Sequence, residues 1–335
     1  MNSSRRLSFG LMAAALALVG WLHMATLLIT ALFCYFALRQ FCYRGSKAVA
    51  LTLFFSVLGL VAFGLLFFLQ QASIAFPKLA ESTIPVILEY AEKHRVTLPF
   101  TDLASLKLLA MDEVKARMAA IPTYARAAVL QCVYLIIGVV IAVSLFLNAK
   151  LGLEGDPDVG RNSAYALTLR ELAVRMRTFY RSFTRVMGAQ ILISAINTLL
   201  TGAFLVVADF PYAWLLAILT FLCGLLPIVG NLISNLIITS IAFAKSPEMA
   251  LVALAFLVVV HKLEYFLNSK IIGDRIKNPM WMTLIGLLVG EKLMGIPGMI
   301  LAPVVLYYIK VEASREQAEA GASPAATLTP KSSAA

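Results

Sequence analysis

The stretch from Ala48 to Gln70, AVALTLFFSVLGLVAFGLLFFLQ, decides the fold class of this chain and contains no charged residue. About 20 apolar residues in a helix are enough to cross the roughly 30 Å of hydrocarbon in a bilayer. The stretch therefore predicts a transmembrane helix, and several similar runs flank it on both sides.

The overall composition agrees with this interpretation. Of the 335 residues, 61% are hydrophobic and 14% are charged, and the mean hydropathy is +0.87. A soluble domain has about a quarter charged residues and about half apolar ones. One core surrounded by water cannot hide this excess of apolar residues, so lipid must solvate part of the chain. The sequence predicts an all-helical polytopic membrane protein.

Residues 1–72 are predicted to form the amino-terminal membrane segments. The apolar run 8–38 would be about 46 Å long as one helix, which exceeds an untilted span. Either one steeply tilted helix or two short helices joined near residues 21–24 fits this length. Basic residues flank both ends of the run, so the rule that positive loops stay in the cytoplasm favours the pair.

Residues 73–125 differ from their neighbours because they mix charged residues with four prolines, Pro77, Pro85, Pro99 and Pro122. We expect a small exposed helical insert outside the cytoplasm, followed by a membrane span within 126–149. Residues 150–186 carry many arginines, and Arg177, Arg181 and Arg185 line one helical face. This pattern predicts a basic amphipathic cytoplasmic helix lying at the membrane surface, with its arginines near lipid phosphates.

Residues 187–311 are predicted to form a carboxy-terminal membrane bundle with re-entrant hairpins. Several apolar runs here are shorter than a full span and are interrupted by proline and glycine. Such breaks are tolerated in a membrane only where protein or water covers the freed backbone groups, and in transporters they commonly build the substrate site. Residues 212–244 fit two crossings or a re-entrant hairpin. The tail, 312–335, is expected to be disordered.

The turn at Pro227 and Gly230, with Asn231 and Asn235 after it, is the first candidate for a solute path. Proline removes a backbone donor and glycine permits a sharp reversal, so carbonyls and the two amides could face one cavity. A plain tight turn whose asparagines bond neighbouring helices is the alternative. Gln190 and Asn197, seven residues apart, could line the same polar path or only link helices.

A second candidate lies in the run from His261 to Asn268, HKLEYFLN. His261 and Glu264 share a helix face, as do Glu264 and Asn268. A carboxylate beside a histidine inside an apolar run could bind and release a proton, as a proton-coupled carrier requires. An interhelical ion pair or a head-group anchor is the alternative.

Other function classes find little support in the sequence. The net charge of +10 comes from residues between apolar runs, which favours topology signals over nucleic-acid binding. The four cysteines include no Cys-x-x-Cys pair, and serine-hydrolase, zinc-protease and nucleotide-binding motifs are missing from the sequence. We therefore expect no enzyme activity, no cofactor and no metal site.

Four blocks in the carboxy-terminal half resemble the autoinducer-2 exporter family of bacterial membrane proteins. They are Leu226–Ile233 (LPIVGNLI), Asn268–Ile276 (NSKIIGDRI), Asn278–Gly290 (beginning NPMW) and Leu293–Pro303 (LMGIPGMILAP). The order and spacing of the blocks carry the resemblance. Ser269 stands where many members have proline.

The resemblance implies about eight membrane segments, both termini in the cytoplasm, and a homo-oligomer, with a pentamer as the first form to consider. It also implies a secondary transporter of the bacterial inner membrane that exports a small polar solute resembling autoinducer-2, a quorum-sensing signal. A sodium/proton antiporter and a membrane scaffold without transport are the alternatives. The expected partners are the solute and membrane lipid.

Overall fold

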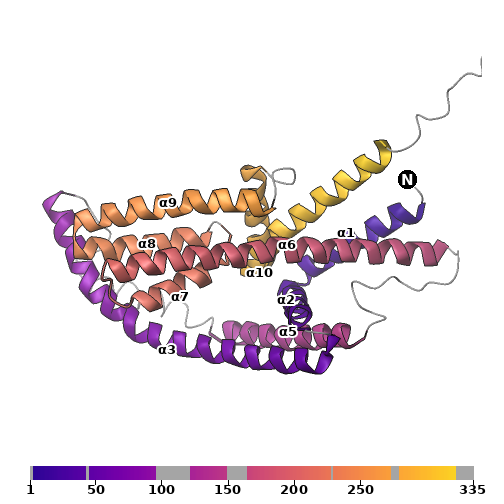
Figure 1. The fold of residues 1–335 in the computed structure, drawn as a ribbon, viewed down its shortest axis with the longest axis horizontal. Coiled ribbons are helices and arrows are strands. Elements are labelled where there is room, and N and C mark those ends of the chain that lie inside the picture. The colour runs from indigo at the N-terminus through magenta and orange to yellow at the C-terminus, as the bar shows by residue number, and fades with distance from the viewer. Residues whose placement is uncertain are drawn as a thin grey trace, which may run out of the picture.

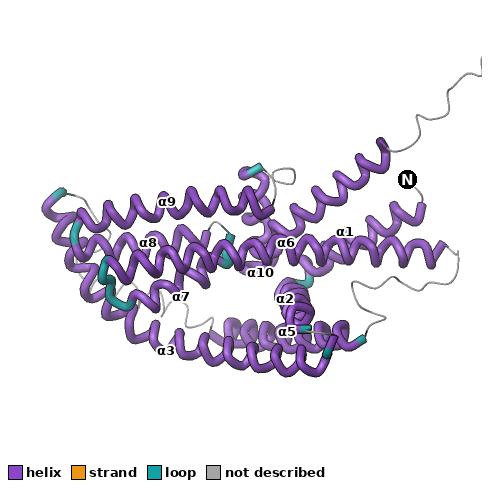
Figure 2. Tube along the Cα trace, in the orientation of Figure 1, coloured by secondary structure: helices purple, strands orange, loops and turns teal. Residues whose placement is uncertain are grey.

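The computed structural model describes residues 3–42, 45–95, 121–148, 164–227, 229–272 and 279–321. This part of the chain is helical and contains no strand, which confirms the predicted fold class (Figure 1; Figure 2). The helices are α1 (Ser3–Trp21), α2 (Ala25–Phe41), α3 (Lys47–Lys93), α5 (Ile121–Leu147), α6 (Ala164–Val207), α7 (Ala213–Gly224), α8 (Val229–Lys245), α9 (Pro247–Ile272) and α10 (Met280–Gly321).

Helix α6 is the axis of the fold. Its 44 residues span about 66 Å at 1.5 Å per residue, and it runs along the length of the molecule (Figure 1). Phe179 and Phe183 in its first half pack into an apolar core with residues of α1, α2, α3, α5 and α10. Leu205 near its end packs into a second core with α3, α7, α8 and α9. Two cores therefore share one helix.

The continuity of α6 differs from the predicted division between 150–186 and 187–311. No proline interrupts this helix, and Gly188 alone does not break it. The change at residue 186 is therefore a change of surroundings along one helix, from a basic half to an apolar half. Residues 150–163 lie outside the described residues.

The run 8–38 contains two helices, as one of the two alternatives predicted. Helices α1 and α2 meet at an angle of 116°, and the break falls at residues 22–24. His23 has a left-handed backbone (φ 53°) there, which ends α1 sharply.

Helix α3 continues through the predicted boundary at residue 72. It passes Pro77 and Pro85 and reaches Lys93, about 70 Å from its start. Each proline removes a helical hydrogen bond, which accounts for the curved course of α3 in Figure 1. Its last turns pack on α8, where the rings of Tyr90 and Phe243 lie 4.8 Å apart. Residues 96–120 of the expected insert lie outside the described residues, and 121–125 begin α5.

Helix α10 folds back on itself at Gly295, whose φ of 65° and ψ of −147° are not helical. The two arms of this hairpin touch through Gly290 and Gly298, and a Cβ atom on either glycine would overlap the backbone of the other. This reversal lies within 187–311, where the sequence predicts segments interrupted by proline and glycine. However, the second arm continues to Gly321 and buries Glu312, so the expected disordered tail does not begin at 312.

Length and composition allow four described helices to cross a membrane, or five if the bent α1–α2 pair counts as one span. Helices α7 and α8 are apolar but shorter. Only 11% of the most apolar window of α3 is buried within the chain, so its surface is available to lipid.

Candidate functional site

Helices α7 and α8 form a hairpin whose two ends lie at the same end of α6. Lys245, the last residue of α8, donates to the carbonyls of Ala208 and Asp209, each at 2.7 Å, just before α7 begins. The 12 residues of α7 span about 18 Å, less than the roughly 30 Å of hydrocarbon. Two crossings and a re-entrant hairpin, the two predicted alternatives, both place the ends of the hairpin on the same side.

Side chains of α6 hold the tip of this hairpin. Gln190 Nε2 donates to the carbonyl of Gly224 at 2.5 Å, and Ser194 Oγ donates to that of Phe221 at 2.8 Å. The last four carbonyls of a helix have no partner within it, and these two lie at the end of α7. The polar groups of α6 therefore satisfy backbone acceptors that lipid could not satisfy.

Gly230 allows the two arms of the hairpin to touch just behind the tip. A Cβ atom at this position would overlap the carbonyl of Cys223. The turn itself is closed by the amide of Val229, which donates to the carbonyl of Pro227 at 2.7 Å. Pro227 and Gly230 thus shape the turn through their backbones.

A chain of polar side chains begins one residue after Gly230 and links three helices. Thr201 Oγ1 donates to Asn197 Oδ1 at 3.2 Å, and Asn197 Nδ2 donates to Asn231 Oδ1 at 3.4 Å. Asn231 Nδ2 then donates to Glu264 Oε2 at 2.6 Å. Thr201, Asn197 and Asn231 are buried, and Glu264 is 17% exposed. Every donor points toward the carboxylate, so the bonds polarise one another in the same direction.

The chain reaches the surface of the bundle at His261. Its Nδ1 lies 3.7 Å from Glu264 Oε2, and its side chain is 59% exposed. Glu264 and Asn197 also line a narrow crevice between α6 and α9, whose other walls are apolar side chains such as Ile196, Leu200 and Val260. The network therefore joins a buried interior to an open face, with a carboxylate between them.

The sequence of residues 7–314 matches the model of the family described as "AI-2E family transporter". The chain belongs to the AI-2E family. It is also 29% identical over 154 residues to the protein named "Putative transport protein YdbI" of Bacillus subtilis (strain 168). That alignment covers 45% of this chain and 44% of the relative, so it spans less than half of the relative's length.

In this AI-2E family chain, the fold brings together four predicted site residues, Asn197, Asn231, His261 and Glu264. Gln190 lies apart from them, because its amide holds the hairpin tip. Asn235 is half-buried and has no recorded hydrogen bond to another described residue. The side chain of Asn268 lies outside the described part.

Sequence reasoning overlooked Ser194 and Thr201, although a signal for both was present. Polar residues on α6 recur at spacings of four, three and four through Gln190, Ser194, Asn197 and Thr201. This spacing places all four side chains on one helix face.

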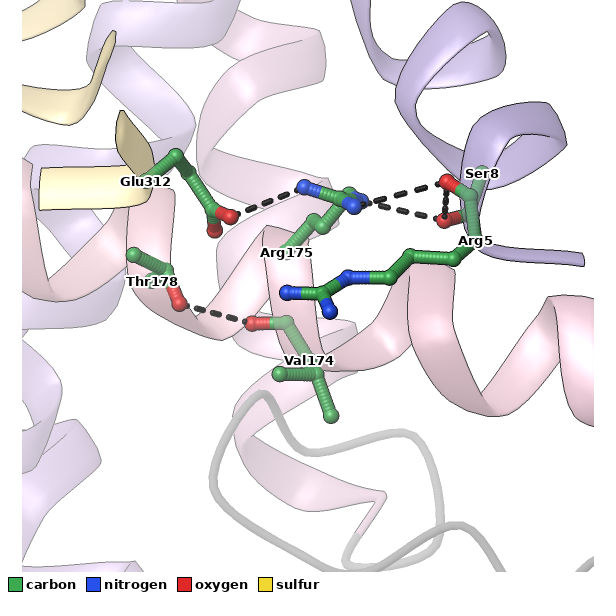
Figure 3. Close-up of polar contacts among 6 residues, drawn as sticks. All are labelled: Arg5, Ser8, Val174, Arg175, Thr178 and Glu312. Carbon is green, nitrogen blue, oxygen red and sulfur yellow. Dashed lines mark hydrogen bonds and ion pairs between the residues drawn. The ribbon is translucent and has the colours of Figure 1, made fainter. Parts of the chain in front are cut away.

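A second buried cluster of this AI-2E family member ties α1, α6 and α10 together (Figure 3). Arg175 Nη1 pairs with Glu312 Oε2 at 2.8 Å, and each side chain is only 2% exposed. Arg175 also donates from Nε to Ser8 Oγ at 3.0 Å and from Nη2 to the carbonyl of Arg5 at 3.4 Å. The ring of Phe9 lies against the guanidinium, 4.8 Å from centroid to Cζ.

This cluster corrects two expectations. Arg175 belonged to the basic stretch expected near lipid phosphates, and Glu312 to the tail expected to be disordered. However, Arg175 lies four residues before Phe179 and eight before Phe183, so it continues the apolar face of α6. The family match, residues 7–314, includes both Ser8 and Glu312.

Proposed function

We propose that this chain is a secondary transporter that exports a small polar organic solute resembling autoinducer-2, and that the Thr201–Asn197–Asn231–Glu264 network is the polar step of its path. The observation that carries the proposal is the oriented hydrogen-bond chain between α6, the α7–α8 hairpin and α9. Family membership supports the transport class. The name of the Bacillus subtilis relative supports it as well.

The depth of the network supports a role in transport. From Gly188 to Val207 helix α6 has no charged residue, and this half is about 29 Å long, which matches the hydrocarbon thickness. Asn197 lies about 13 Å from Gly188, near the middle. Polar groups at this depth are costly without partners and are characteristic of functional sites. Broken helices near the midplane form the solute sites of several transporter folds.

The chemistry of the network suits a neutral solute that is rich in hydroxyl groups. Each hydroxyl can donate to the Glu264 carboxylate and accept from an asparagine amide. Such a solute can replace the internal hydrogen bonds one at a time, so no polar group is left unpaired during its passage. The apolar walls of the crevice leave these groups as its polar contacts.

We assign the coupling role to Glu264, assisted by His261. A carboxylate that opens toward an exposed imidazole can take up a proton on one side of the bundle and release it on the other. Glu264→Gln keeps the shape of the side chain but cannot ionise. This variant should still exchange solute across the membrane, but it should not accumulate solute when a pH gradient is imposed.

The test uses purified protein in lipid vesicles, with autoinducer-2 as the probe and an imposed pH gradient. Wild-type protein should accumulate the probe, and Glu264→Gln should only equilibrate it. Glu248→Gln is the matched control, because Glu248 is a fully exposed carboxylate on the same helix. Accumulation by Glu264→Gln at the wild-type level would remove Glu264 from the coupling step.

The same carboxylate also favours a cation/proton antiporter as the second candidate. In that case wild-type vesicles without organic solute would move protons when sodium is added, and Glu264→Gln would not. A scaffold without transport would give neither signal.

We further propose a homo-oligomer in the bacterial inner membrane with both termini in the cytoplasm, and native mass spectrometry would count its subunits.

A further inference from the structure

One exposed stripe of α6 changes abruptly from arginine to aliphatic side chains along the helix. Arg170, Arg181 and Arg185 lie on this stripe and are exposed. Seven residues after Arg185 the same stripe continues with Leu192, then Leu199 and Val206, which are 50%, 73% and 69% exposed. At 100° per residue these six positions fall within about 60° of one another, so they form one line along the helix.

The change from arginine to leucine falls around Gly188, which lies on the same line. No atom lies within 4 Å of a Cβ built on this glycine, so the stripe is open there. Exposed leucine and valine favour hydrocarbon, whereas exposed arginine favours water or head groups. Gly188 therefore marks one boundary of the hydrocarbon, consistent with the 29 Å of uncharged helix that follow it.

Arg181 and Arg185 lie just outside this boundary. They are about 10 Å and 5 Å from Gly188 along the axis, and the head-group layer adds about 5 to 8 Å on each side. A guanidinium on a flexible side chain reaches that layer from both positions. Neither residue pairs with an acidic side chain in the described part of the chain.

We propose that Arg181 and Arg185 form a binding site for the phosphate of an anionic phospholipid. The two residues are about one helical turn apart, about 6 Å along the axis, so their guanidinium groups can reach the oxygens of one phosphate diester from two sides. Planar guanidinium groups bind phosphate in a bidentate manner, which a lysine could not reproduce. Leu192 is exposed on the same stripe, seven residues after Arg185 and on the hydrocarbon side of Gly188, and it provides a surface for the acyl chains of the same lipid.

The inference is independent of the transport proposal, because its measured quantity is lipid binding. The full-length protein, purified in neutral detergent, is titrated with phosphatidylglycerol or phosphatidylcholine of identical acyl chains, and native mass spectrometry counts the bound lipid. Wild-type protein should prefer phosphatidylglycerol. Arg181→Gln/Arg185→Gln should weaken its binding by on the order of tenfold and leave phosphatidylcholine unchanged.

Arg170→Gln is the matched control. Arg170 lies on the same stripe but about 22 Å from Arg185, beyond the head groups, so its loss should keep the preference. Gel filtration checks that each variant remains folded. Three results would overturn the proposal: a folded double variant with full preference, an equal loss for Arg170→Gln, or competition by millimolar inorganic phosphate as strong as by the lipid.

Discussion

Asn231 Nδ2 donates to Glu264 Oε2 at 2.6 Å, and this bond joins the α7–α8 hairpin to α9. Asn231 follows Gly230, where the two arms of the hairpin touch, so the position of the tip fixes the position of the amide. If the hairpin moves, either this bond breaks or Glu264 moves together with the hairpin. The carboxylate and the hairpin are expected to act as one unit.

Asn231→Asp should change the pH dependence of transport. The substitution keeps the shape but replaces the donor by an acceptor, so two carboxylates face each other and must share one proton. Transport should be present at acidic pH and be lost as the pH rises and the shared proton leaves. Solute uptake into vesicles across a pH series measures this. Asn235→Asp, on the same helix but outside the network, should follow the wild-type profile, and an equal shift there would contradict the assignment.

Gly230→Ala should disrupt the hairpin, because the added Cβ meets the carbonyl of Cys223 and backbone atoms cannot move aside cheaply. Overpacking of this kind costs about 1 to 3 kcal/mol of stability or more. We expect a lower unfolding temperature in detergent and loss of transport. Gly188→Ala, a helical glycine with open space around it, should be neutral or stabilising by roughly 0.5 to 1 kcal/mol. Equal effects of the two substitutions would disprove the steric explanation.

Removing one partner of the Arg175–Glu312 pair should destabilise the protein strongly. Arg175→Met leaves a fully buried carboxylate without its cation, which costs about 3 to 5 kcal/mol. The double variant Arg175→Met/Glu312→Leu should recover much of this loss, since no charge remains buried. Chemical unfolding of the wild type, the two single variants and the double variant completes the double-mutant cycle. Strictly additive losses would mean that the pair does not interact.

Glu291→Gln provides the contrast for that cycle. Its partner Lys292 lies 3.9 Å away, and the two side chains are 48% and 85% exposed. Exposed pairs of this kind contribute little, so the change in unfolding free energy should stay within about 0.5 kcal/mol.

Lys93 and Arg177 should face opposite sides of the membrane. Lys93 ends α3 three residues after Tyr90, whose ring packs against Phe243 near the base of the hairpin. Arg177 lies in the basic half of α6. Single cysteines at the two positions, in a background without the four native cysteines, can be labelled with an impermeant maleimide from one side. Modification of both from the same side would reject the proposed topology.

Much of the secondary structure could be predicted from local pattern alone. The uncharged run 48–70 lies within α3, as predicted. The length of 8–38 left one tilted helix or two short helices open, and its basic flanks favoured the pair, which the break after α1 shows. These features depend on the composition and length of each stretch, and those two properties decide whether a helix can cross a bilayer. Helices α3 and α6 continue through the predicted boundaries at 72 and 186, because proline and charge change the surroundings of a membrane helix without ending it.

The candidate site was predicted as two groups, a solute path and a proton-coupling pair, and the contact between Asn231 and Glu264 that joins them was not predicted. Gln190 and Asn197 looked equivalent at a spacing of seven, yet one holds the hairpin tip and the other enters the network. The difference depends on which groups of α7 and α8 come opposite each turn of α6. Helical periodicity gives the face of a residue but not its partner on another helix.

By itself, the sequence determined that this protein is a helical membrane protein with interrupted segments. The hydropathy of each stretch decides whether lipid or water solvates it, and proline and glycine interrupt its helix. Only the tertiary structure decided the pairing of Asn231 with Glu264, 33 residues apart, and of Arg175 with Glu312, 137 residues apart. Such pairs form because a buried polar group must find a partner wherever packing brings one within reach. That packing depends on contacts between distant helices, and no local period of the sequence records it.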